Sequence, residues 1–311
     1  EAIMRTFLYC EAGFVEKEQW LPNSWVNVEC PTPEDIHYLT NQFNVPESFL
    51  SDIADTDERP RIEYEGNWLL TIIRIPVQSQ EQGIPFTTIP LGIMTNNEII
   101  ISVCYYKTEL IPDFIRYTRR KEVVVRHKYD LILRLIHSSA VWFLKYLKQI
   151  NNEVAHAEKA LEKSIRNEDL LRLMKLEKSM VYFNTSIRGN EVMLTKLQSI
   201  FQEPVYMDNE LVEDVETELK QAHLTVNIYS DILTGTMDAF ASIISNNVNT
   251  IMKRMTSISI ILMVPTLIAS FYGMNVPIYG ENMPHGFAII VMISITLSAL
   301  SFFIFRKIKW F

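Results

Sequence analysis

The sequence predicts an α+β protein made of a charged, water-soluble body followed by two C-terminal membrane-spanning helices. The prediction depends on two observations. No Lys, Arg, Asp or Glu occurs from Met255 to Gly280, and none from Asn282 to Phe305. Each of these stretches exceeds the roughly 20 residues that a helix needs to cross a bilayer. The second observation is that β-branched runs come first and long helical repeats follow in the remaining, charged part of the 311 residues.

Composition excludes several classes of function. The net charge of −8 argues against a nucleic-acid partner. The three cysteines, Cys10, Cys30 and Cys104, have no C-x-x-C spacing, so we expect buried free thiols in a reducing compartment. The first 30 residues mix apolar and charged side chains and do not resemble a signal peptide. We find neither a phosphate-binding loop nor a set of catalytic residues, so we do not expect an enzyme.

Residues 1–125 are predicted to form a cytoplasmic α/β domain. Two β-branched runs bounded by turn residues, Trp68–Pro76 and Glu98–Cys104, are typical of strands. The segment Pro31–Pro33 is followed by two acidic residues, which is a helix-start pattern.

Residues 126–254 are predicted to form a cytoplasmic helical bundle and a stalk. Apolar residues recur every three or four positions in two sets, which predicts two antiparallel helices separated near Asn167. The second helix is expected to end at 202–205. The first set is Phe143, Leu147, Ile150, Val154, Ala157 and Leu161, and the second is Leu173, Leu176, Met180, Phe183, Ile187, Leu194, Leu197 and Phe201.

A third helix is predicted to run from near Asp208 to Tyr272, through Gly235 and Pro265. At 1.5 Å per residue it would be roughly 100 Å long, much longer than a bilayer core of about 30 Å. It therefore joins the stalk to the membrane domain, residues 255–311, with spans at about 255–274 and 286–305. A proline is tolerated inside a membrane helix when neighbours satisfy the freed carbonyl.

Basic residues flank the two spans on one side only. The loop of about 11 residues between the spans has no Lys or Arg. The positive-inside rule then places both termini in the cytoplasm and the loop outside. The flanking residues are Lys253, Arg254, Arg306, Lys307 and Lys309.

One face of the stalk and first span carries polar residues at the heptad spacing of alternating four and three. We name this set the polar stripe. Its members are Asp238, Ser242, Ser245, Asn249, Met252, Thr256, Ser259, Met263, Thr266 and Ser270. Two interpretations are open. Small and hydroxyl residues pack membrane helices closely, or several copies of the stripe line a water-filled pore.

The pore interpretation favours a hydrated cation. The stripe has no carboxylate inside the span, and Mg²⁺ sheds its water reluctantly. Neutral oxygens that accept hydrogen bonds from metal-bound water would suit such an ion. Met252 and Met255, or Met263, could form an apolar ring that closes by dewetting.

The first span ends in Tyr272-Gly273-Met274-Asn275, and Met283-Pro284 follows in the loop. This resembles the CorA family of magnesium transporters, which carry Gly-Met-Asn at the outer end of the first of two C-terminal spans. The resemblance covers the whole layout. It implies a funnel-shaped homopentamer in the plasma (inner) membrane, passing Mg²⁺ inward and gated by internal Mg²⁺, with no organic cofactor. Gly273 is expected to let the backbone leave the helix without a Cβ penalty, and Asn275 to present its carbonyl at the pore mouth.

The resemblance also assigns single residues. It implies that Thr266, Met263, Asn249 and Asp238 face the pore. It implies that Arg306, Lys307 and Lys309 form a cytoplasmic basic ring. Asp214 matches a stalk acid that helps to bind regulatory Mg²⁺, although acids at a helix start also offset the helix dipole.

Two departures from the family pattern concern the loop and the regulatory site. The family loop reads Met-Pro-Glu-Leu, whereas Met283–Gly286 has no carboxylate, and Glu281 is the nearest substitute. Around 78–82, where the family supplies an acidic partner, only Glu81 occurs. His285 is either a zinc ligand or a solvated loop residue.

Two other functions fit the sequence less well. Transport of zinc, cobalt or nickel is the alternative, although these metals prefer His and Cys, which the stripe lacks. A two-span receptor would need a sensor domain between its spans, and the short loop leaves no room for one.

Overall fold

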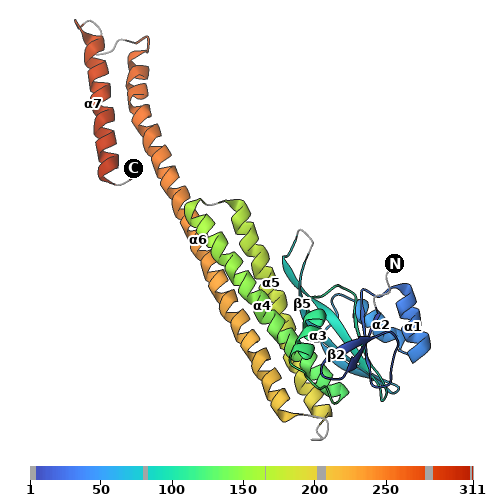
Figure 1. Cartoon of the computed structure of the whole chain (residues 1–311). Coiled ribbons are helices and arrows are strands. Elements are labelled where there is room, and N and C mark those ends of the chain that lie inside the picture. Colours follow the sequence, from blue (N-terminus) through green and yellow to red (C-terminus); the bar gives the residue numbers. More distant parts are fainter. Residues whose placement is uncertain are drawn as a thin grey trace. The chain divides into compact units, whose positions relative to one another are not determined.

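The computed structural model describes residues 5–79, 83–164, 166–201, 208–276, 283–308 and 310. The chain divides into two compact units, Glu1–Gly235 and Thr236–Phe311 (Figure 1). The division predicted from composition, at 125/126 and 254/255, stays a prediction.

A seven-stranded sheet forms the centre of the N-terminal part of the first unit. Its strand order is β2-β1-β3-β7-β6-β5-β4. β3 and β7 pair in parallel, and the other neighbours pair antiparallel. The strands are β1 Arg5–Cys10, β2 Phe14–Lys17, β3 Trp25–Glu29, β4 Arg61–Glu65, β5 Trp68–Gln78, β6 Phe86–Thr95 and β7 Ile100–Cys104.

Local sequence signals account for the element boundaries. The predicted helix start is confirmed: α1 (Pro33–Phe43) begins with a capping box between Thr32 and Asp35. The predicted strand Trp68–Pro76 lies within β5. β7 begins two residues later than predicted, because the Asn96 side chain accepts hydrogen bonds from the main chain of Glu98 and Ile99 and forms a turn.

In the described part of the first unit, five helices precede the long helix. They are α1, α2 (Glu47–Ala54), α3 (Leu110–Arg120), α4 (Lys128–Lys163) and α5 (Asn167–Ile200). The two long helices are confirmed, and every member of both predicted apolar sets is buried. The predicted end of the second helix at 202–205 lies outside the described residues, and α5 ends at Ile200.

α5 is attached to the sheet by buried polar side chains. The Asn190 amide donates to the carbonyl of Arg74 (2.8 Å), and its Oδ1 accepts from the Arg74 N–H (2.9 Å). The hydroxyl oxygens of Ser186 and Thr88 lie 2.7 Å apart and share a hydrogen bond. These bonds fix one register of α5 on strands β5 and β6, because an unpaired buried amide costs stability.

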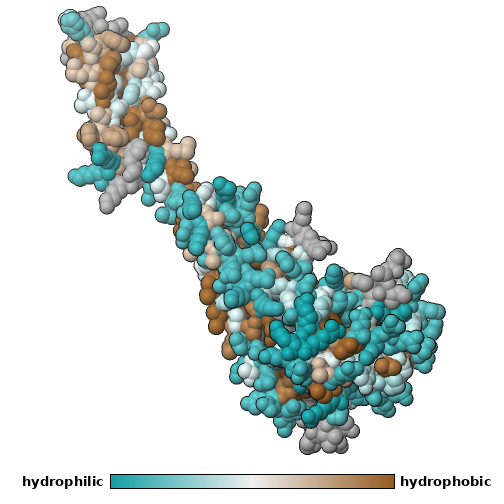
Figure 2. All heavy atoms as spheres, viewed as in Figure 1, coloured by the Kyte–Doolittle hydropathy of each residue, from teal (hydrophilic) through white to brown (hydrophobic). Residues whose placement is uncertain are grey.

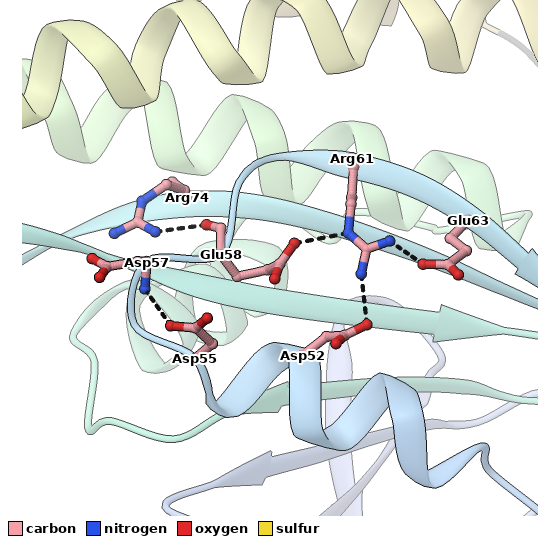
Figure 3. A network of polar contacts seen from close by, with 7 residues as sticks. All are labelled: Asp52, Asp55, Asp57, Glu58, Arg61, Glu63 and Arg74. Carbon is pink, nitrogen blue, oxygen red and sulfur yellow. Dashed lines mark hydrogen bonds and ion pairs between the residues drawn. The ribbon is translucent and has the colours of Figure 1, made fainter.

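Two arginines tie the loop after α2 to the sheet (Figure 3). Arg61 bonds to three carboxylates, those of Asp52 (2.6 Å), Glu58 (2.8 Å) and Glu63. Arg74 donates to the main-chain carbonyl of Glu58 at 2.7 Å. Asp52, Glu58 and Glu63 therefore share one cationic partner, and we assign these three carboxylates a structural role.

The thiols differ from the expectation. All three cysteines are free, but only Cys104 is buried, and burial raises its pKa to about 12. Cys10 and Cys30 are partly exposed. Both lie at strand ends, where the sheet no longer covers them: Cys10 closes β1, and Cys30 follows β3.

α6 (Asn209–Tyr272) and α7 (Gly286–Lys307) are long and apolar enough to cross a membrane. The predicted start and end of the 64-residue α6 are confirmed, and Gly235 and Pro265 lie inside the helix. In Figure 2, hydrophobic side chains are frequent on the surface of α7 and of the C-terminal part of α6, whereas hydrophilic side chains cover most of the visible face of the first unit.

Candidate ion pathway

The polar stripe lies on the exposed surface of α6, and all ten of its residues are exposed in the single chain. Met252 is 58% exposed and Met263 is 62% exposed. Most other residues of this part of α6 are exposed too, so exposure alone does not distinguish the stripe. Its position relative to α7 does.

α7 packs on the side of α6 opposite the stripe. Ser257 is fully buried, and Ile261 and Pro265 are partly buried and line a groove between the two helices. Residues two apart on a helix differ by about 200° in direction, so Ile261 points roughly opposite to Ser259 and Met263. α7 therefore leaves the stripe uncovered within one chain.

The hydroxyl groups of the stripe are oriented by their own helix. Ser242, Ser259 and Thr266 donate to carbonyls four residues earlier, at 3.0, 2.9 and 2.8 Å. A hydroxyl whose hydrogen is used in this way keeps its lone pairs as acceptors. Water bound to a cation points its hydrogens outward, so these oxygens suit a hydrated cation and not an anion.

The Gly-Met-Asn segment follows the end of α6. The Gly273 N–H donates to the carbonyl of Ala269 (2.9 Å), and the Met274 N–H donates to the carbonyl of Phe271 (3.3 Å). The expectation that glycine avoids a Cβ penalty here is confirmed, although not through a positive φ. A Cβ at Gly273 would instead lie 3.2 Å from the Ala269 carbonyl oxygen, a tight contact that glycine relieves. Asn275 is exposed beyond this turn.

The loop and the basic tail are described only in part. Glu281 and Lys309 lie outside the described residues. Arg306 and Lys307 are exposed in the last turn of α7, where positive charge offsets the helix dipole. His285 is exposed and precedes α7 in a left-handed conformation, with a φ of 72°.

Asp214 is exposed near the start of α6. The carboxylate of Asp208 accepts from the main chain of Glu210 (3.1 Å) and caps the helix. Glu81, the predicted partner of Asp214, lies outside the described residues. Within the described ranges, no three His, Cys, Asp or Glu side chains gather closely enough to hold a metal ion. A regulatory site at Asp214 would therefore need groups from another copy or from outside those ranges.

Sequence reasoning missed the polar residues between α6 and α7. Ser257 and Ser294 are buried there, and the Ser298 hydroxyl donates to the Ile261 carbonyl at 3.4 Å. Pro265 was the available signal, because a proline inside a helix frees the carbonyl four residues before it.

Together, the charged body and the two membrane-length helices found among the described residues indicate a membrane protein, and one face of α6 is polar and uncovered by α7. The chain belongs to the family described as CorA-like Mg²⁺ transporter protein, which matches residues 22–307.

Relatives agree in sequence and in fold. The chain is 25% identical to the cobalt/magnesium transport protein CorA of Methanocaldococcus jannaschii, over 92% of this chain and 90% of the relative. It is 24% identical to the protein of the same name from Thermotoga maritima, over 92% of this chain and 83% of the relative.

Solved structures support the fold. The complete CorA magnesium transporter from M. jannaschii superposes with a TM-score of 0.83 at 22% identity and covers 100% of both chains. The full-length CmaX protein matches with a TM-score of 0.69 at 16% identity, over 99% of this chain and 98% of CmaX.

Proposed function

We propose that this chain is a subunit of a homopentameric channel that lets Mg²⁺ flow down its electrochemical gradient across the plasma (inner) membrane. Family membership and the names of the relatives support the class of cargo. The single observation that carries the proposal is the polar stripe, which lies opposite α7 and is uncovered in one chain. If several copies of the chain surround an axis, with their polar stripes facing the axis and α7 on the outside, the stripes face a shared, water-filled pathway.

Such a ring accounts for the chemistry of the stripe. Each level, such as Thr266 or Asn249, contributes one oxygen per subunit, and Asn275 contributes a ring of side-chain carbonyls at the mouth. Together with Ser245, Thr256 and Ser270 these oxygens accept hydrogen bonds from the water shell, so Mg²⁺ need not be dehydrated. Asp238 adds a ring of carboxylates outside the span, which concentrates cations.

The driving force is the membrane potential. A charge of +2 moving inward gains about 4.6 kcal/mol per 100 mV, so transport needs no catalytic site and the protein is not an enzyme. Both termini lie in the cytoplasm in this proposal. The basic residues Arg306, Lys307 and Lys309 then sit at the inner surface.

Internal Mg²⁺ closes the channel in this proposal. Mg²⁺ bridges Asp214 to an acidic group of a neighbouring subunit and holds the stalks together, which keeps the methionine ring at Met252 and Met255 narrow. Loss of the ion restores repulsion between carboxylates and shifts the population toward an open ring.

The test is uptake by the purified protein in vesicles loaded with a Mg²⁺-sensitive dye. We expect Mg²⁺ entry that rises with an inside-negative potential imposed by a K⁺ gradient, with protein-free vesicles as the control. Mg²⁺ uptake that does not depend on the membrane potential would contradict a passive channel. The same vesicles offered Co²⁺, Ni²⁺ and Zn²⁺ test the alternative cargo, and preference for one of these over Mg²⁺ would replace the proposal.

A further inference from the structure

Pro265 interrupts the hydrogen-bond ladder of α6 inside the candidate span. Proline has no N–H, so the carbonyl of Ile261, four residues earlier, loses its helical partner. A membrane interior offers no water to replace it. The orphaned carbonyl therefore needs a donor from a neighbouring helix.

Ser298 of α7 is that donor. Its Oγ lies 3.4 Å from the Ile261 carbonyl oxygen. Ile261, Pro265 and Ser298 all line the groove between α6 and α7, a cavity of about 850 Å³ whose other walls are largely apolar. A hydroxyl that reaches the freed carbonyl across such a groove stabilises it, because no main-chain N–H of α6 and no water is there to do so.

Other hydroxyls of α7 behave differently. Thr296 and Ser301 donate to carbonyls of their own helix, at 2.7 and 2.9 Å. Ser298 instead reaches the other helix, at the one carbonyl that Pro265 frees. Its distance is long for an O–H···O bond, so we expect a modest energetic effect.

We propose that Ser298 is a positioning residue for the pore: it satisfies the carbonyl that Pro265 frees and so fixes the direction of the neighbouring stripe residues. Pro265 lies between Met263 and Thr266 of the polar stripe. This inference depends on the proposed function, because it gives Ser298 a role in conduction without contact to the ion.

A double-mutant cycle tests the proposal on the full-length protein. Ser298→Ala is made in the wild-type background and in Pro265→Ala, where residue 265 regains an N–H and Ile261 no longer needs Ser298. We expect Ser298→Ala to lower Mg²⁺ uptake by about threefold with Pro265 present, the average effect of a hydrogen bond between membrane helices. In the Pro265→Ala background we expect uptake to change by less than about 1.5-fold.

Two further variants separate positioning from packing. Ser298→Thr keeps the hydroxyl and should restore wild-type uptake. Ser301→Ala removes a hydroxyl that bonds within α7 and should have the same effect in both backgrounds. An equal effect of Ser298→Ala in both backgrounds, or no effect in either, would overturn the proposal.

The midpoint temperature of unfolding of the same variants in detergent provides a second readout. If Pro265→Ala abolishes transport, the cycle is read from these midpoints, and Ser298→Ala should lower the midpoint only when Pro265 is present. If the wild-type protein takes up no Mg²⁺, the proposed function fails, while the midpoints still decide whether Ser298 satisfies the carbonyl.

Discussion

α5 and the second half of α6 use the same spacing of residues for opposite purposes. In α5 the residues at intervals of three and four are apolar, from Leu173 to Leu197, and they are buried against the rest of the first unit. In α6 the residues at intervals of four and three are mainly polar, from Asp238 to Ser270, and all of them are exposed.

Periodicity therefore indicates which residues share a face, and side-chain chemistry indicates what covers that face. Burying a large apolar side chain contributes about 1.5–3 kcal/mol, so the face of α5 folds onto its own chain. Burying a polar side chain without a partner costs a similar amount. The polar stripe is therefore best covered by water or by hydrogen-bonding groups, which one chain does not supply.

The largest expected effect tests the polar side of this comparison. Asn275→Ala should lower Mg²⁺ uptake by about a hundredfold, because a hydrogen bond to a charged partner contributes up to about 3 kcal/mol and about 1.4 kcal/mol corresponds to a factor of ten. Uptake in vesicles measures it. The elution volume of the variant should match the wild type, because Asn275 is exposed in its own chain. Wild-type uptake in this variant would disprove the assignment of Asn275 to the pore mouth.

Two asparagines provide a matched pair across the two regions. Asn190 is fully buried and pairs with both main-chain groups of Arg74, whereas Asn249 is exposed on the stripe. Asn190→Ala leaves both groups unpaired and should lower the free energy of unfolding by about 2–4 kcal/mol. Asn249→Ala should change it by less than about 0.5 kcal/mol but should alter uptake. Denaturant titration of both variants measures their free energies of unfolding. Equal losses would show that Asn249 is a packing residue.

Water access separates the stripe from other exposed faces of α6. Single cysteines at Ser245, Asn249, Ser259 and Thr266 should react with a small charged thiol reagent about tenfold faster than cysteines at Ile258 and Ile261. Thiolate is the reactive form, and it is disfavoured in apolar surroundings. Ile258 is the sharper control, because it is 48% exposed in the single chain yet lies off the stripe. Equal labelling rates at Ile258 and Ser259 would favour the helix-packing interpretation over a pore.

The helices were predictable from the sequence because each depends on a repeated local pattern. The existence and order of α4 and α5 followed from apolar spacing, and the end of α6 followed from the uncharged stretch after Arg254. The strand order was not predictable, because the parallel pairing of β3 with β7 brings together segments about 75 residues apart that no local pattern links. The exposure of Cys10 and Cys30 depends on that order too.

The candidate site was predictable as a face of one helix but not as a set of contacts. The stripe was visible because its polar residues recur at a fixed spacing in an apolar background. The bond from Ser298 was not visible, because it depends on the rotation of α7 against α6. The roles of Asn275, Asp214 and the stripe stay predictions, since a pore or a regulatory site requires several copies of the chain.

The smallest expected effect concerns the body alone and depends on pH. Glu29, at the end of β3, has its pKa raised from 4.5 to about 7, mainly by burial, while a hydrogen bond with Asn27 and the charge of Lys107 oppose the rise. The folded state therefore keeps this proton above pH 4.5, where the unfolded chain loses it. Stability should fall as the pH rises from about 4.5 to about 7 and should not change further through this group above that. Because Glu29 is partly solvent-exposed, we expect a loss of only about 1–2 kcal/mol.

Glu29→Gln cannot lose a proton, so its unfolding free energy should exceed that of the wild type at pH 7.5 and match it near pH 4.5. Glu16→Gln removes an exposed carboxylate from the same sheet and should leave the wild-type pH dependence unchanged. If the difference in unfolding free energy between Glu29→Gln and the wild type does not vary with pH, burial does not raise the pKa of Glu29 in the folded protein.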